Sequence, residues 1–357
     1  MARPIRIAQA TVVALAAAAA VVPRPPALVD RLYSQGAYPS IQVALTSASN
    51  ALPVAVFDVV IIGCAGLGLW WLRAAWRDRR RAGWPIAMWT LTRRLGTLAA
   101  IAYLWFVGAW GLNYARPPIE QRLGLAAGAA TPREVRDLLD AAIAKANALY
   151  LPSRAEGFVP YRAEEDVARA LHLVEASHGR PSPTTPGTPK PTLLTPYFRM
   201  AGVDGLTAPA ALETLLNPDL TARERPFTLA HEWAHLSGIG PEADANFMAW
   251  LVTQAPGTWV HTQYSGWLFL VSEAAAQVPA EARRASLAGL ADGPRRDLAD
   301  IARRQQSRVD LVERIGWRVY DSYLKSQGVG EGVRSYSRVV ELIVRSRRTP
   351  AGDAVPQ

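Results

Sequence analysis

The chain has 357 residues, half of them hydrophobic, and a formal net charge of +9. Up to Pro118 it holds 12 Lys and Arg against 3 Asp and Glu, whereas the remainder holds 27 of each. The positive excess therefore belongs entirely to the apolar N-terminal part, which excludes the basic surface that a nucleic-acid partner needs. The single cysteine excludes a disulfide framework within the chain and a zinc site built from cysteines.

Three apolar stretches predict transmembrane helices in residues 1–118, at about 7–22, 52–72 and 95–112. The second and third approach the length of about 20 residues that a bilayer-crossing helix needs. The first follows two arginines and is also compatible with a secretory signal peptide. Val-Val-Pro-Arg after it is a poor cleavage site, which favours a retained anchor.

Arginines near these stretches predict the orientation in the membrane. The connection between the second and third stretches is rich in Arg, whereas the loop at 23–51 contains only Arg24 and Arg31. Since basic loops stay in the cytoplasm, we expect the N-terminus inside and residues 119–357 outside. The sequence thus predicts a multi-pass protein of the cell (cytoplasmic or inner) membrane, with the lipid bilayer as one partner.

Residues 119–357 are expected to form a predominantly helical domain with a small β element. Thr131-Pro132-Arg133-Glu134 has the pattern of a helix start, and apolar residues follow it at helical spacing. The prolines of 180–196 predict a flexible, exposed insertion. Short strands are plausible only in 197–220. The fold class is therefore mainly α, with transmembrane helices first.

The sequence His231-Glu232-Trp233-Ala234-His235 predicts a zinc site. Two histidines four apart on a helix lie on one face, and the glutamate between them can act on water beside the metal. With 5 His in the chain, the pattern is expected by chance roughly 0.006 times. We therefore expect His231 and His235 to bind Zn²⁺ and Glu232 to act as the general base.

A catalytic zinc usually has a third protein ligand. Glu242 follows a glycine-containing turn at the start of a second predicted helix, and Asp244 is its rival, about 200° away around that helix. Glu242 is the preferred ligand. His261, Tyr264 and Tyr336 are candidate donors to the transition state, with a packed or solvent-facing role as the simpler interpretation.

These residues resemble those of the Glu-zincins, metallopeptidases whose third ligand is commonly followed four residues later by an Asp that orients the first histidine. Here Asn246 stands at that position, and the interval from His235 to Glu242 is shorter. The chain also resembles a bacterial family of membrane proteins of unknown function with three N-terminal spans and an extracytoplasmic zincin-like domain. That resemblance rests on segments along most of the chain, among them 32–39, 226–247, 264–266, 323–328 and 335–337.

Together these features predict a membrane-anchored zinc metallopeptidase that hydrolyses peptide bonds of peptide or protein substrates outside the cytoplasm. Two alternatives stay open at this point. The zinc could serve only stability, although closed structural sites usually prefer cysteine ligands. The chain could also be a non-catalytic membrane scaffold or binding protein with a zincin-derived domain.

Overall fold

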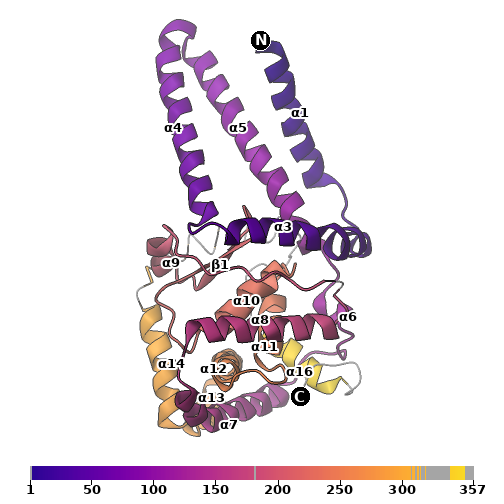
Figure 1. Ribbon diagram of the computed structural model, residues 1–357, viewed down its shortest axis with the longest axis vertical. Coiled ribbons are helices and arrows are strands. Elements are labelled where there is room, and N and C mark those ends of the chain that lie inside the picture. Colours follow the sequence, from indigo (N-terminus) through magenta and orange to yellow (C-terminus); the bar gives the residue numbers. More distant parts are fainter. Residues whose placement is uncertain are drawn as a thin grey trace.

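The computed structural model describes residues 2–180, 182–306 and 338–349, together with positions 308, 309, 312, 314 and 318. Three long helices, α1 (Ala2–Val21), α4 (Val56–Ala82) and α5 (Trp84–Ala109), project from one side of a helical domain (Figure 1). The N-terminus and the arginine-rich turn between α4 and α5 lie together at the end remote from the domain. This places the two segments predicted to be cytoplasmic at one end and the domain at the other.

Helices α1 and α4 are long and apolar enough to cross a membrane, which suggests membrane association. The third predicted span lies on α5, which does not meet the same criterion, so a three-span arrangement stays a prediction. Residue 52, expected to open the second span, lies instead in a turn before α4. Helix α4 begins only at Val56, where the Glu213 carboxylate accepts from the backbone N–H groups of Val56 and Phe57.

Between α1 and α4 the chain runs across the base of the long helices. It forms α2 (Pro26–Val29), the π-helical η1 (Asp30–Ala37) and α3 (Tyr38–Asn50) in direct succession. Figure 1 shows α3 lying crosswise between the long helices and the domain. After α5, the short helices η2 (Gly111–Ala115) and α6 (Ile119–Arg122) lead into the domain.

The domain is built of helices around one large hydrophobic core. Its first long helix begins as predicted, because Thr131 and Glu134 cap each other's backbone N–H groups. The same core contains Tyr38, Trp110 and Tyr114, so the expected boundary at residue 118 does not separate two independent cores. The described helices of the domain are α7 (Pro132–Glu156), α8 (Pro160–Ser177), α10 (Arg225–Leu236), α11 (Glu242–Thr253), α12 (Val260–Gln277), α13 (Ala280–Ala288), α14 (Asp292–Gln305) and α16 (Arg338–Arg348).

The small β element is present where short strands were expected. Strands β1 (Gly205–Ala208) and β2 (Glu213–Leu216) pair antiparallel, with Gly205 opposite Leu216. A short helix, α9 (Thr195–Ala201), precedes them and takes up the start of that region. The sheet lies beside α10, so β1 and β2 form part of the surroundings of the predicted metal ligands.

The proline-rich segment corrects one expectation. Residues 182–194, which we call the strap, are mostly extended and end in a turn at 193–194. They pack against the domain rather than forming an exposed insertion, with Thr184 and Lys190 buried. The amide of Gln42 exchanges two hydrogen bonds with the backbone of Thr185, and Trp233 donates to the carbonyl of Gly187. Because a proline-rich chain satisfies few of its own backbone groups, these groups remain available to neighbouring side chains.

Candidate metal centre

Helix α10 presents the two histidines of the motif on one face. Pro226 occupies its first turn, and alanines in its interior favour helix. The helix ends at Leu236, and two residues later Gly238 has a φ of +82°, which suits glycine. A side chain there would also lie only 3.0 Å from Tyr38 and Asn113. The turn that follows returns the chain so that α11 begins beside α10 with Glu242.

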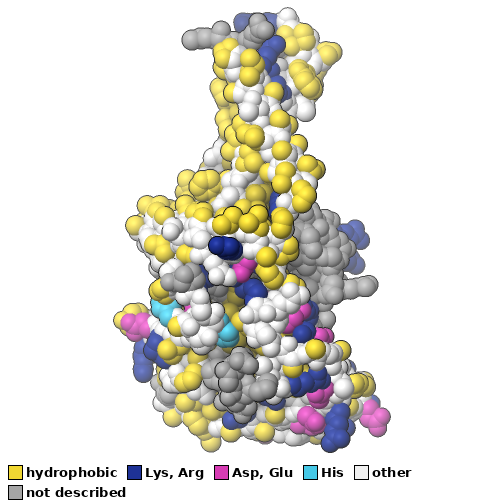
Figure 2. Space-filling model, turned by 90° about the vertical axis from the view of Figure 1, so that its right-hand side faces the viewer, with side chains coloured by type: hydrophobic (Ala, Val, Ile, Leu, Met, Phe, Trp, Pro, Cys, Tyr) yellow, Lys and Arg dark blue, Asp and Glu magenta, His cyan; other side chains and the backbone are white. Residues whose placement is uncertain are grey.

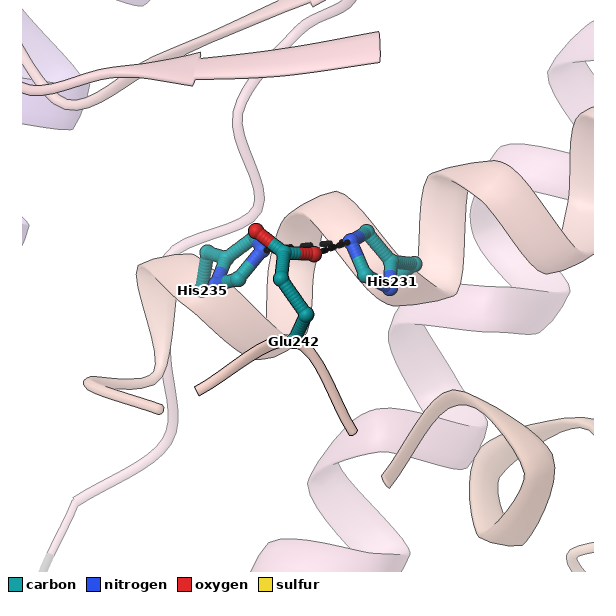
Figure 3. A group of neighbouring side chains, drawn as sticks. All are labelled: His231, His235 and Glu242. Atoms are coloured by element: carbon teal, nitrogen blue, oxygen red, sulfur yellow. Dashed lines mark hydrogen bonds and ion pairs between the residues drawn. The ribbon is translucent and has the colours of Figure 1, made fainter. Parts of the chain in front are cut away.

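The side chains of His231, His235 and Glu242 converge, and we call them the His-His-Glu group (Figure 3). The two Nε2 atoms are 3.1 Å apart, and Glu242 Oε2 lies 3.1 Å from that of His231 and 3.6 Å from that of His235. Ligands about 2.0–2.1 Å from a tetrahedral zinc would be about 3.3–3.4 Å from one another. The donor atoms present therefore fit a zinc ion.

The electrostatics of the group suit a cation. Burial opposes protonation of His235, but the Glu242 carboxylate outweighs it and raises the pKa of His235 to about 9. Burial likewise opposes ionisation of Glu242, and the two imidazoles outweigh it and hold the pKa of Glu242 well below its usual value. A metal ion would take the place of the proton that the carboxylate holds on His235, because zinc binds neutral imidazole and ionised carboxylate.

Glu232 is held by strand β1. Glu232 is 4% exposed. The hydroxyl of Thr207 donates to the Oε2 of Glu232 at 2.9 Å and to the backbone carbonyl of Glu232 at 2.8 Å. Burial raises the pKa of Glu232. A Cβ at Gly205 would lie 2.5 Å from Oε1 of Glu232, so any larger residue there would displace this carboxylate. Neither β1 residue was predicted, and the one signal available was a glycine in a strand, which often marks close approach.

Four side chains from distant parts of the chain cap the C-terminal end of α10. Tyr38 donates to the carbonyl of Leu236 at 2.8 Å, and Trp110 donates to that of His235 at 2.9 Å. Arg116 donates to Gly238, and Arg180 to Ser237. The last carbonyls of a helix have no partner within it, so these donors satisfy groups that burial would otherwise leave unpaired.

Asp244, the rival third ligand, lies outside the His-His-Glu group. Burial raises its pKa to about 6, although Arg122 and Arg338 favour its charged form, and its carboxylate accepts from the backbone of Ile119. The structure thus brings Glu242, and not Asp244, to the two histidines. The two carboxylates diverge as their positions on a helix predict.

The expected hydrogen bond from Asn246 to a histidine is not found. The Nδ1 of His235 faces the carbonyl of Ile239 at 2.7 Å, because the tight turn after α10 brings that carbonyl onto the ring. The Nδ1 of His231 has no hydrogen-bond partner among the described residues. Asn246 itself is buried on α11. The turn carbonyl therefore orients the second histidine, whereas the first, His231, for which the resemblance implied a partner at position 246, has none at its Nδ1 among the described residues.

The other candidates do not face the His-His-Glu group. His261 Nε2 is bonded to the carbonyl of Ala222, and the hydroxyl of Tyr264 donates to Asp297 at 2.7 Å. Both residues are almost fully buried, as their simpler interpretation required. Tyr336 lies outside the described residues. Among the described candidates, the structure therefore brings together the three donors of the His-His-Glu group, with Glu232 on the same helix as the two histidines.

Comparison with known proteins places the chain in a family but gives no activity. No curated protein and no solved structure matches it significantly. A family model described as "Protein of unknown function (DUF3810)" matches residues 33–344, which include all of α3 to α14 and the His-His-Glu group. The chain therefore belongs to the DUF3810 family.

Proposed function

We propose that this protein is a membrane-anchored, zinc-dependent metallopeptidase with a zincin-like domain. The observation that carries the proposal is the convergence of His231, His235 and Glu242 at distances that fit tetrahedral zinc, with Glu232 on the same helix. A closed structural site would need a fourth protein ligand, and the group found among the described residues has three. An open fourth position is typical of catalytic zinc.

The chain's own residues have distinct tasks in this proposal. His231, His235 and Glu242 would hold the zinc, which at such sites polarises a carbonyl oxygen and makes water more acidic. Glu232 accepts the proton of the attacking water at its carboxylate and returns it to the leaving amine. Thr207 holds that carboxylate in place from β1. Since Glu232 is almost fully buried, the transferred proton is kept from bulk water.

The membrane arrangement is part of the proposal. The N-terminus and the α4–α5 turn share one end of the molecule, and the helical domain that contains α10 lies beyond the other end of the long helices (Figure 1). This supports three spans, with the arginine-rich turn in the cytoplasm and the domain outside it. Cysteine accessibility to an impermeant reagent, at Arg80→Cys and Lys145→Cys, tests the orientation. Labelling of Arg80→Cys from outside intact cells would contradict it.

Metal analysis of the purified full chain tests the metal centre. We expect about one zinc per chain, lost in His231→Ala and retained in His178→Ala, a control histidine bonded only to its own helix end and the adjacent Ser177. Glu232→Gln should keep the metal and lower peptide-library cleavage by about 10²–10⁴-fold. Unchanged cleavage in Glu232→Gln contradicts the mechanism. A wild-type chain that takes up no zinc when loaded favours the non-catalytic scaffold instead.

A further inference from the structure

The helices that cross the base of the long helices bury polar side chains and expose large apolar ones. Ser34, Gln42, Thr46 and Ser49 of η1 and α3 face the domain, each at most 2% exposed, beside the buried Tyr38 and Pro39. Leu28 on α2, Leu32 on η1 and Val43 on α3 are 53%, 60% and 41% exposed, on a face that also carries small and polar residues. A helix at a water-exposed surface usually turns its large apolar residues inward. Exposed leucine and valine here are expected where the outer face meets an apolar medium.

After Asp30 and Arg31 this part of the chain carries no charge over a long stretch. From Leu32 to Phe57 the sequence contains no Asp, Glu, Lys or Arg. Figure 2 shows hydrophobic side chains continuing from the long helices onto the adjoining rim of the domain, with a Lys or Arg side chain at its edge and most charged residues below it. We call this rim the apolar collar, and its largest exposed members are Leu28, Leu32, Val43, Leu52, Val54 and Leu193.

The place of the collar indicates what covers it. Helix α1 ends at Val21 and α4 begins at Val56, so the chain between them lies where the long apolar helices leave the domain. A bilayer surrounding these helices would end at this level. On α5, Trp105 is half exposed and donates to the carbonyl of Ala210 in the β1–β2 turn, and tryptophan is enriched at such interfaces. The collar is therefore continuous with the lipid-facing surface.

The metal centre is tied directly to this collar. Tyr38, the first residue of α3, donates to α10 one residue after His235, and Trp110 at the end of α5 donates to His235 itself. No flexible linker separates the collar from α10. The distance between the membrane surface and the His-His-Glu group is therefore fixed by the fold rather than by a tether.

We propose that the apolar collar rests in the membrane interface, and that the substrate of this site is the membrane-proximal segment of a membrane-anchored polypeptide. The proposal about the substrate rests on the proposed peptidase function, whereas the proposal about the collar does not. A site held at a fixed, short distance from the bilayer meets juxtamembrane segments at high effective concentration. Segments far from the membrane reach it only as freely diffusing chains.

Depth-dependent fluorescence quenching tests the collar. In a Cys64→Ser background, Val43→Cys is labelled with an environment-sensitive dye in proteoliposomes, and Lys145→Cys on α7 is the matched control. We expect lipids with a quencher at a shallow chain position to quench the dye at residue 43 at least threefold more than at residue 145. Equal, weak quenching at both places overturns the proposal. Self-quenching that grows with the protein-to-lipid ratio assigns the collar to a second copy and also overturns it.

A substrate library tests the substrate class. A single-span reporter carries a randomised segment either next to its span or behind a flexible linker of about 40 residues, in proteoliposomes with wild type or Glu232→Gln. We expect at least about tenfold more cleavage of the adjacent library, all of it dependent on Glu232. Equal cleavage of both libraries overturns the substrate class and leaves the peptidase intact. If neither library is cleaved, both the peptidase function and the substrate class are refuted. The quenching experiment still tests whether the collar lies in the membrane interface.

Discussion

Gly205 lies against Glu232, the proposed general base, and replacing it with alanine is the sharpest test of the proposed mechanism. The added Cβ would lie 2.5 Å from Oε1 of Glu232 and 2.9 Å from its Cγ and Cδ, where ordinary contacts begin at 3.4 Å. The carboxylate must therefore retreat by about 1 Å. A shift of that size at a catalytic group costs about 10²-fold in rate, or about 2.7 kcal/mol of transition-state stabilisation. The strain should also destabilise the fold by about 1–3 kcal/mol.

Measuring zinc content and cleavage together separates a displaced Glu232 carboxylate from a loss of metal binding. Gly205→Ala should keep its zinc, because the atoms that its Cβ meets belong to Glu232 and to none of the three metal donors. Cleavage of the juxtamembrane library should fall to near the level of Glu232→Gln. Gly289→Ala, where the nearest atom lies at 3.4 Å, is the matched control and should be unchanged. A zinc-loaded Gly205→Ala with full activity would refute the assignment of Glu232 in its observed position.

Three further outcomes follow from contacts remote from the His-His-Glu group. Glu213→Gln removes the charged partner of the buried Lys190 ammonium and should lower the free energy of unfolding by about 3–5 kcal/mol. The double variant Glu213→Gln/Lys190→Met should recover that stability. Thermal unfolding in detergent measures both. Tyr38→Phe should cost about 1–3 kcal/mol in the same assay, because the Leu236 carbonyl loses its donor. Hydrogen bonds from Arg348 lower the pKa of Glu134 from 4.5 to about 2, so this carboxylate stabilises the fold above pH 4.5 and loses that effect as pH falls toward 2. Glu134→Gln should flatten the melting temperature across that window, and an unaltered profile would contradict the ion pair.

Local rules explain what could be predicted from the sequence. The capping box at Thr131 and Glu134 places the start of α7, and the spacing of His231 and His235 places both on one face of α10. Each of these patterns involves residues within one turn of helix. The divergence of Glu242 from Asp244 follows from the same geometry. These predictions succeed because helix periodicity alone decides them.

Long-range contacts explain what could not be predicted. The wall formed by Gly205 and Thr207 around Glu232 joins residues at least 25 positions apart, and the bond from Tyr38 to Leu236 spans 198. No local pattern encodes such pairs. The prediction that the strap is exposed was wrong for a related reason. Its prolines correctly exclude a helix, but they do not predict which side chains donate to its carbonyls. Its order comes from Gln42 and Trp233, which lie in distant segments.

The limits of the family match support this view of the fold. It begins at residue 33, inside η1, and ends at residue 344 in α16. The shared unit thus includes the crosswise helix α3 and the long helices α4 and α5, while α1 lies outside it. If residues 119–357 formed a unit separate from the long helices, a family match could begin near residue 119 and still cover that whole unit. Because Tyr38, Trp110 and Arg116 complete the end of α10, the smallest unit that can hold the His-His-Glu group in this geometry must include them. We therefore expect a chain that starts at residue 119 to lose the zinc site along with its anchor.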